Sequence, residues 1–261
     1  MATFWKLTAP NYSDYHHTYI NGSVEHPYRL PGIQCHSCGH TWIAPSRVLP
    51  IDCPLSLRSR LKPRPVTVAE YREICDAICG VCNCSASDLK PGNRLLPSSI
   101  KIPSRPRADF LWGSLGSLII SETIKDAFER DGFTGFVVFP MTMSKIGRRE
   151  ANLPPPIPAS GEPEDIMRSA VQVPGTDVGP YFELLVRADS RRVRGTEPSI
   201  VCKVCGCEEW CPPRQWSMEE SLWTGTDLFF LAPTTMLVVT DRVKERLVEI
   251  GATNVRAVEV G

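Results

Sequence analysis

Two pairs of cysteines have the residue type and spacing that metal ligation requires. Cys35 and Cys38 stand in the segment CHSCG, and Cys202 and Cys205 in the segment CKVCG. A chain that turns tightly between two thiolates can bind one zinc ion with both of them. The glycine after each pair favours this turn, because glycine adopts positive φ at no steric cost. Each pair supplies half of a four-cysteine site, so the sequence predicts that the two pairs share one zinc ion.

The two cysteine pairs are separated by about 164 residues, so a shared site closes a long loop. Closing this loop costs about 4–5 kcal/mol of chain entropy, whereas structural zinc binding supplies roughly 10–16 kcal/mol. The metal is therefore sufficient to hold the distant pairs together. Four thiolates leave no open position for water, so we expect one structural zinc per chain and not a catalytic one.

Other residues remain open as ligands. The cysteines at 75, 79, 82 and 84 follow a C-x3-C-x2-C pattern with one more cysteine beyond it, which leaves a second metal site or an iron–sulfur site as alternatives. Cys75 and Cys79 fall on a predicted amphipathic helix, where cysteine usually acts as a small hydrophobic residue. The sequence does not decide whether this group binds a second metal. Further candidate ligands are Cys75, Cys79, Cys82, Cys84, Cys53, Cys207, Cys211, His36, His40, His16, His17 and His26.

The sequence contains none of the common catalytic motifs. It has no P-loop, no GxGxxG after a strand, no HExxH and no GxSxG. Asp109 and Asp227 directly precede the apolar runs FLW and LFFL, and this placement favours a role in ending or capping strands over catalysis. We therefore expect a protein that is not an enzyme.

The elements that follow the two cysteine pairs form a sequence repeat. Residues 118–138 and 237–257 align without a gap at an offset of 119. Each copy predicts a β-branched strand, then a Ser or Thr that caps a helix with an acidic first turn, then a glycine that ends the helix before a second strand. Duplication and convergence both produce such a likeness. Identical residues in the two copies are Leu118/Leu237, Lys125/Lys244, Gly132/Gly251 and Thr134/Thr253.

In each copy, two apolar residues lie one helical turn apart, which predicts that they face the core. They are Ile124 and Phe128 in the first copy and Val243 and Leu247 in the second. Another helix is predicted over the segment TVAEYREICDAICG, where Thr67 and Glu70 have capping-box spacing and Gly80 can end the helix.

These elements predict an α+β fold. It would contain two related strand–helix–strand units joined by a zinc-ribbon-like four-cysteine site, itself formed from two distant CxxCG knuckles. We expect an N-terminal half (1–150), a proline-rich linker (151–165) and a C-terminal half (166–261), together forming one compact unit.

The charges of the chain are balanced, with 29 basic and 29 acidic residues among 261. No global field therefore attracts nucleic acid, although the segment RADSRRVRG is locally basic. No apolar run approaches the roughly 20 residues needed to cross a bilayer, and no signal peptide is evident. CxxC spacing without a signal favours metal ligation in a reducing compartment, so we expect a cytoplasmic protein with no membrane association.

The order of these motifs resembles the double-CXXCG motif protein family of myxobacteria. Three further segments contribute to the resemblance: the PG loop at 91–92, the DF-x-W segment at 109–112 and the DLF segment at 227–229. The likeness extends over most of the chain and is least distinctive over 140–200. It leaves the cysteines between 75 and 84 outside the pattern. The four cysteines that it carries over are Cys35, Cys38, Cys202 and Cys205.

Members of that family are grouped with immunity proteins against contact-delivered, swarm-inhibition toxins. The resemblance therefore implies a cytoplasmic antidote that binds and neutralises a cognate protein toxin. It does not indicate which surface binds the toxin. The alternative is a nucleic-acid-binding or regulatory protein of the zinc-ribbon kind.

Overall fold

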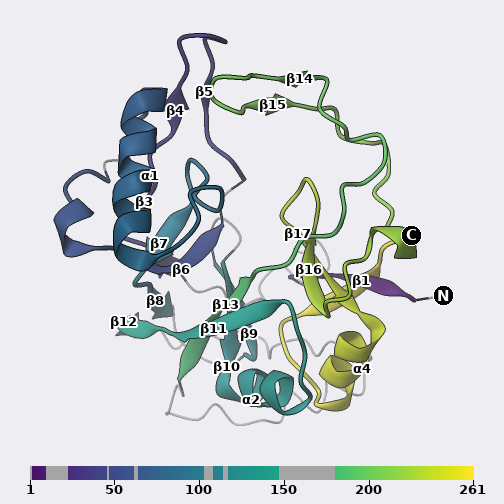
Figure 1. Cartoon of the computed structure of the whole chain (residues 1–261). Coiled ribbons are helices and arrows are strands. Elements are labelled where there is room, and N and C mark those ends of the chain that lie inside the picture. Colours follow the sequence, from purple (N-terminus) through teal and green to yellow (C-terminus); the bar gives the residue numbers. More distant parts are fainter. Residues whose placement is uncertain are drawn as a thin grey trace. The chain divides into compact units, whose positions relative to one another are not determined.

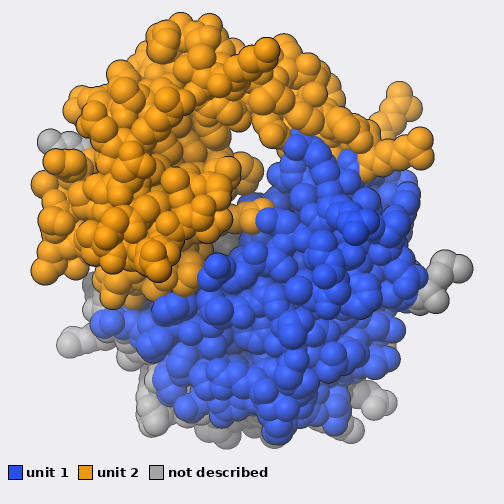
Figure 2. Space-filling view, in the orientation of Figure 1, with its two compact units in different colours: residues 1–24, 99–193, 215–261 blue, residues 25–98, 194–214 orange. Residues whose placement is uncertain are grey.

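The computed structural model describes residues 2–9, 23–45, 47–61, 64–102, 108–113, 117–146 and 180–261. The chain divides into two units (Figure 2), each of which is assembled from segments distant in sequence. Unit 1 comprises residues 1–24, 99–193 and 215–261, and unit 2 comprises 25–98 and 194–214. Both copies of the repeat belong to unit 1, and both cysteine pairs belong to unit 2. The expected linker (151–165) lies outside the described residues.

Unit 1 contains two four-stranded antiparallel sheets of the same topology (Figure 1). Each copy of the repeat contributes a strand, a helix and a final strand, and the strand just before each copy forms a hairpin with its first strand. Smaller sheets elsewhere complete an α+β architecture. The first sheet has the order β9 (Phe110–Trp112), β10 (Leu118–Ser121), β13 (Tyr181–Val186), β11 (Phe136–Pro140). The second has the order β16 (Leu228–Leu231), β17 (Met236–Thr240), β1 (Phe4–Thr8), β18 (Arg256–Glu259).

The two sheets exchange their third strands. Strand β1 precedes the first copy in sequence but pairs with β17 and β18 of the second copy, whereas β13 precedes the second copy but pairs with β10 and β11 of the first. The registers agree, because Phe4 pairs with Thr240 as Tyr181 pairs with Ser121. Each copy of the repeat therefore completes its sheet with a strand from outside the copy, and the strand that comes first in the chain pairs with the second copy.

An equivalent cation–π contact supports each exchanged strand. The Lys244 ammonium lies 4.6 Å from the centroid of the Trp5 ring, and the Lys125 ammonium lies 5.4 Å from that of Phe182. The two lysines are the identical pair of the sequence repeat, and the two aromatic residues occupy equivalent positions on β1 and β13. The ammonium is attracted to the electron-rich face of the ring, so each contact adds to the packing of its helix on the strand.

The helices of the repeat, α2 (Glu122–Arg130) and α4 (Asp241–Glu249), pack their predicted faces into one core. All four predicted core residues of these helices are at most 1% exposed, so this prediction is confirmed. Gly132 and Gly251 follow the helices with φ of 65° and 63°, which lets the chain leave each helix in the left-handed conformation.

Unit 1 also contains a three-stranded sheet of order β12 (Thr142–Ile146), β8 (Ser99–Ile102), β2 (Ser23–Glu25), and the short 3-10 helix η3 (Glu220–Leu222). A separate apolar cluster lies on the other face of β1, where Phe4 meets the rings of Trp223 and Phe229 edge to face at 5.7 and 5.9 Å between centroids. The exchanged strand β1 is therefore packed on both faces.

Unit 2 is built around α1 (Val68–Cys82). Its buried side chains, among them Tyr71 and Ile78, pack in one core with residues of a small mixed sheet and of the 3-10 helix η1 (Leu55–Leu57). The Tyr71 hydroxyl donates a hydrogen bond to the carbonyl of Leu89 at 3.1 Å. The sheet has the order β3 (Tyr28–Arg29), β7 (Arg94–Leu96), β6 (Val48–Asp52).

The start of α1 was predicted correctly, but its end was not. Thr67 and Glu70 form the capping box, in which the backbone N–H of Glu70 donates to the Thr67 hydroxyl and the N–H of Thr67 donates to the Glu70 carboxylate. The helix continues beyond Gly80 and ends at Asn83, whose φ is 54°. Asparagine tolerates the left-handed conformation, so a glycine was not needed there.

Candidate metal centre

Two short hairpins of unit 2 carry the cysteine pairs. The first hairpin consists of β4 (Ile33–Gln34) and β5 (Thr41–Trp42), and the second consists of β14 (Ile200–Val201) and β15 (Glu208–Glu209). Their registers are equivalent, since Ile33 pairs with Trp42 as Ile200 pairs with Glu209. Each CxxCG segment forms the turn of its hairpin.

The backbone of the two turns is also equivalent. Cys35 donates its N–H to the carbonyl of His40 and accepts from Gly39, both at 2.9 Å. Cys202 in the same way donates to Cys207 at 2.9 Å and accepts from Gly206 at 2.8 Å. Both glycines have a φ of 73°, and a Cβ at either position would meet no atom within 4 Å. Backbone conformation, not space, therefore requires these glycines.

The structure brings the four predicted cysteines together. The sulfur atoms of Cys35 and Cys202 are 3.9 Å apart, and those of Cys38 and Cys205 are 3.8 Å apart. All four sulfurs lie within 4.8 Å of one another. Zinc–sulfur bonds of about 2.3 Å in a regular tetrahedron place sulfurs about 3.8 Å apart. The cluster can therefore hold a tetrahedral metal ion without a large movement.

Backbone N–H groups favour the thiolate form of the first cysteine in each turn. The N–H groups of Cys205 and Val204 point at the Cys202 sulfur and lower the pKa of this thiol to about 6. The N–H of Cys38 similarly lowers the pKa of Cys35, whereas burial raises the pKa of Cys205 to about 12. A divalent cation replaces the protons on all four thiols, so metal binding weakens as the pH falls.

Helix α1 supports the second turn. A nitrogen of the Arg72 guanidinium donates a hydrogen bond to the carbonyl of Val204, between the two cysteines, at 3.2 Å. Cys35 is 1% exposed, and the other three cysteines pack against the same apolar core as α1. Core packing and a backbone hydrogen bond therefore position the ligands from the helix side.

The alternative ligands do not join this cluster. His40 faces Glu209 instead, with 3.4 Å between Nδ1 and Oε1. Cys53 is buried, and its sulfur lies 3.7 Å from the carbonyl of Pro54. Cys75 is buried on α1, where burial raises the pKa of its thiol to about 11. In the part of the chain that the structure describes, the four-cysteine cluster is the one group whose ligand atoms are all mutually close. His16 and His17 lie outside that part.

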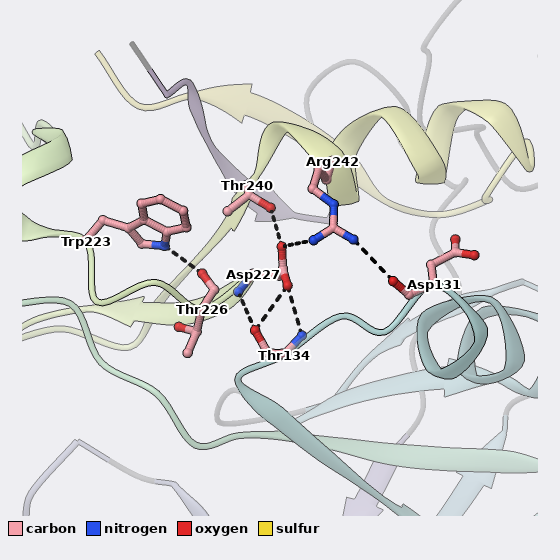
Figure 3. A network of polar contacts seen from close by, with 7 residues as sticks. All are labelled: Asp131, Thr134, Trp223, Thr226, Asp227, Thr240 and Arg242. Atoms are coloured by element: carbon pink, nitrogen blue, oxygen red, sulfur yellow. Dashed lines mark hydrogen bonds and ion pairs between the residues drawn. The ribbon is translucent and has the colours of Figure 1, made fainter.

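A polar network in unit 1 was only partly anticipated from the sequence (Figure 3). The Asp227 carboxylate accepts hydrogen bonds from the N–H and hydroxyl of Thr134 at 3.0 and 3.1 Å, and from the Thr240 hydroxyl at 3.0 Å. Arg242 contacts the same carboxylate at 3.3 Å and donates to the carbonyl of Asp131 at 3.2 Å. Asp227 thus connects the second copy of the repeat to the loop after α2 in the first.

Asp109 makes the reciprocal connection. Its carboxylate accepts from the N–H and hydroxyl of Thr253 at 2.9 and 2.8 Å, and from the Ser121 hydroxyl at 2.9 Å. Both aspartates stand directly before a strand, as the sequence indicated. Their partners were missed, although Thr134 and Thr253 are an identical pair in the alignment. That identity was the available signal in the sequence.

Comparison with known proteins provides no assignment. A scan against protein-family models finds no match, and a search of curated proteins also finds none.

Proposed function

We propose that the four cysteines bind one structural zinc ion in each chain. Thiolate ligands in a tetrahedral arrangement are typical of structural zinc sites. The distances between sulfurs fit the edges of such a tetrahedron. Four protein ligands close the coordination shell, so a metal here has no position for a reacting water. This closed arrangement is the single observation that carries the proposal.

The proposed zinc would join the two hairpins as a zinc-ribbon-like element. The second hairpin has little apolar support of its own, since Ile200 is 57% and Val201 is 50% exposed. Metal bonds would then provide much of the energy that holds this hairpin against the first.

Metal analysis of purified protein tests the proposed zinc site. We expect one zinc per chain in the wild type, and its loss in Cys202→Ser, which removes one of four ligands. Cys211→Ser is the matched control, because Cys211 is exposed and lies in the same unit outside the cluster. Zinc retained at full stoichiometry in Cys202→Ser would refute the proposed site.

We further propose that the protein is a non-enzymatic immunity protein that binds a cognate contact-delivered toxin in the cytoplasm. Support comes from the ordered CxxCG pairs and repeats, which resemble the double-CXXCG motif family. A closed metal site suits a scaffold for a binding surface better than a reaction centre. No helix in the described part of the chain has the length and apolar character required to span a bilayer.

Co-expression tests the proposed immunity. A toxin encoded beside this gene should stop the growth of cells that lack the protein and spare cells that express it. The purified pair should form a stable complex by size-exclusion chromatography. A noncognate toxin of the same kind is the control. Failure both to protect and to bind would reject the immunity function and leave the zinc site intact.

The second candidate is a nucleic-acid-binding protein. It is favoured by the basic segment near Arg191, Arg192 and Arg194, and disfavoured by the zero net charge. Binding that weakens steeply with added salt would support it, because phosphate contacts release counterions.

A further inference from the structure

A second group of thiols lies at the C-terminal end of α1. Cys79 and Cys82 occupy the last turn of the helix, and Asn83 then takes the left-handed conformation. This turn brings the next residue, Cys84, back over the helix end. The sulfur of Cys84 lies 3.4 Å from that of Cys79 and 3.2 Å from that of Cys82.

This group differs in geometry from the four-cysteine cluster. The sulfur of Cys84 is close to each of the other two, and the three do not belong to any set of ligand atoms in the described part of the chain that all lie within 4.8 Å of one another. The contacts of 3.2 and 3.4 Å are also shorter than the 3.8–3.9 Å contacts at the candidate metal centre. Close pairs of sulfurs suit a bond between two thiols better than coordination of a metal.

We propose that these three cysteines are a thiol–disulfide site, in which Cys84 forms a reversible disulfide with Cys79 and Cys82 is the neighbouring thiol that exchanges with it. A disulfide requires the two sulfurs to approach to about 2.05 Å. Cys84 lies beyond the helix end, so its backbone can supply this movement while the hydrogen bonds of α1 are kept. The Cys82 thiol also contacts Cys84, but it donates a shorter hydrogen bond to the carbonyl of Ile78 at 2.8 Å, which favours its reduced form.

The oxidant in this proposal is a low-molecular-weight disulfide such as oxidised glutathione. A protein thiolate attacks one sulfur of the oxidant and releases one glutathione thiolate. The second protein thiol loses its proton and attacks the mixed disulfide, which releases the second glutathione. Two protein thiols are thus oxidised to one disulfide, and one oxidised glutathione is reduced to two thiols. Reduced glutathione in excess reverses both steps.

Exposure and acidity are consistent with this order of steps. All three cysteines are half-buried, so a small oxidant can approach them. Burial raises the pKa of the Cys84 thiol to about 12, which disfavours its thiolate and is consistent with its losing its proton only in the second step. Because the proposed bond joins Cys84 to Cys79, the first attack on the oxidant is assigned to Cys79.

The test uses the full-length, metal-loaded protein in buffers with different ratios of reduced and oxidised glutathione. Free thiols are alkylated at each ratio, and peptides are mapped by mass spectrometry. We expect a peptide linked between Cys79 and Cys84 in oxidising buffer, and its disappearance on return to reducing buffer. Cys211→Ser should behave like the wild type, whereas Cys84→Ser should form no internal disulfide in this group and only accumulate bound glutathione.

Three outcomes would overturn the proposal. One is the absence of the linked peptide under conditions in which exposed Cys211 is glutathionylated. Another is a linked peptide between Cys79 and Cys82 that persists in Cys84→Ser. The third is a second zinc per chain that Cys84→Ser removes, since the group would then be a metal site. If Cys84→Ser does not fold, Cys79→Ala is mapped by the same alkylation and mass spectrometry. It should likewise form no link to Cys84.

Discussion

The two units differ in the contacts that hold their distant segments together. Each joins equivalent pieces that lie far apart in sequence: the two copies of the repeat in unit 1 and the two cysteine hairpins in unit 2. Unit 1 uses exchanged strands, a shared core and two reciprocal aspartate networks. In unit 2 the sulfur contacts join the hairpins, and α1 adds one hydrogen bond. The first kind of junction is built from the protein's own side chains and strands, whereas the second, under the proposed zinc site, would also rely on a bound ion.

Metal removal should produce the largest difference between the units. On chelation at neutral pH, amides of the hairpins at 33–42 and 200–209 should lose their protection against hydrogen exchange, because structural zinc contributes roughly 10–16 kcal/mol to such folds. Amides of α2 and α4 should remain protected. Hydrogen exchange with mass spectrometry gives both readings in one experiment. Equal loss of protection in both units would contradict the proposal that only unit 2 relies on the metal.

The second largest effect is expected in unit 1, where truncation of a core side chain should lower the free energy of unfolding. Phe128→Ala removes a fully buried ring that meets the rings of Phe133 and Phe136, and should lower the free energy of unfolding by about 3–5 kcal/mol. Leu247→Ala, in the second copy, should lower it by about 2–5 kcal/mol. Urea unfolding measures both, and zinc content should not change. Loss of zinc in either variant would show that the two junctions are coupled.

Removing either aspartate should lower the free energy of unfolding by less than the core truncations do. Asp227→Ala leaves the N–H of Thr134 and the hydroxyl of Thr240 without their acceptor and should cost about 1–3 kcal/mol. Asp109→Ala should cost less within the same range, because Asp109 is more exposed and no arginine contacts it among the hydrogen bonds described. Arg242→Ala is the control, because it removes only the charged partner of Asp227 and keeps the threonine hydrogen bonds. A larger effect at Asp109 would show that burial does not set the order.

The capping box of α1 should give a smaller change, in unit 2. Thr67→Ala removes the hydroxyl that accepts from Glu70 N–H and should lower stability by about 1 kcal/mol. Thr67→Ser keeps the hydroxyl and serves as the control. The measurement is thermal unfolding of the metal-loaded protein, and an equal shift in both variants would argue against the cap.

The smallest expected effect is a pH dependence at the same cap. The N–H of Thr67 donates to the Glu70 carboxylate and lowers its pKa below the usual range. Since the folded pKa is the lower one, the stabilisation is complete above the unfolded pKa and is lost as the pH falls through the folded value. Glu70→Gln should remove this part of the acid dependence, as followed by stability against pH. An unchanged profile would exclude the contribution.

Local patterns determined much of the architecture. The ungapped offset of 119 identified two strand–helix–strand copies, and the i, i+4 spacing identified their buried residues. The spacing of Thr67 and Glu70 identified the start of α1. The CxxCG segments identified the cysteines that the structure brings together. Each of these features depends on residues a few positions apart, where backbone geometry limits the possible arrangements.

Only the tertiary structure decided which distant segments meet. The exchange of β1 and β13 is not encoded in either strand alone, because a short apolar strand fits several sheet edges and only its competition with other strands selects one. The aspartates were placed correctly before their strands, but their threonine partners were missed because they lie 93 and 144 residues away in sequence. The end of α1 at Asn83, and with it the contact between Cys79 and Cys84, depended on a left-handed turn that several residues can adopt. The sequence by itself thus determined the pieces of this protein and their chemistry, and long-range packing decided how they are joined.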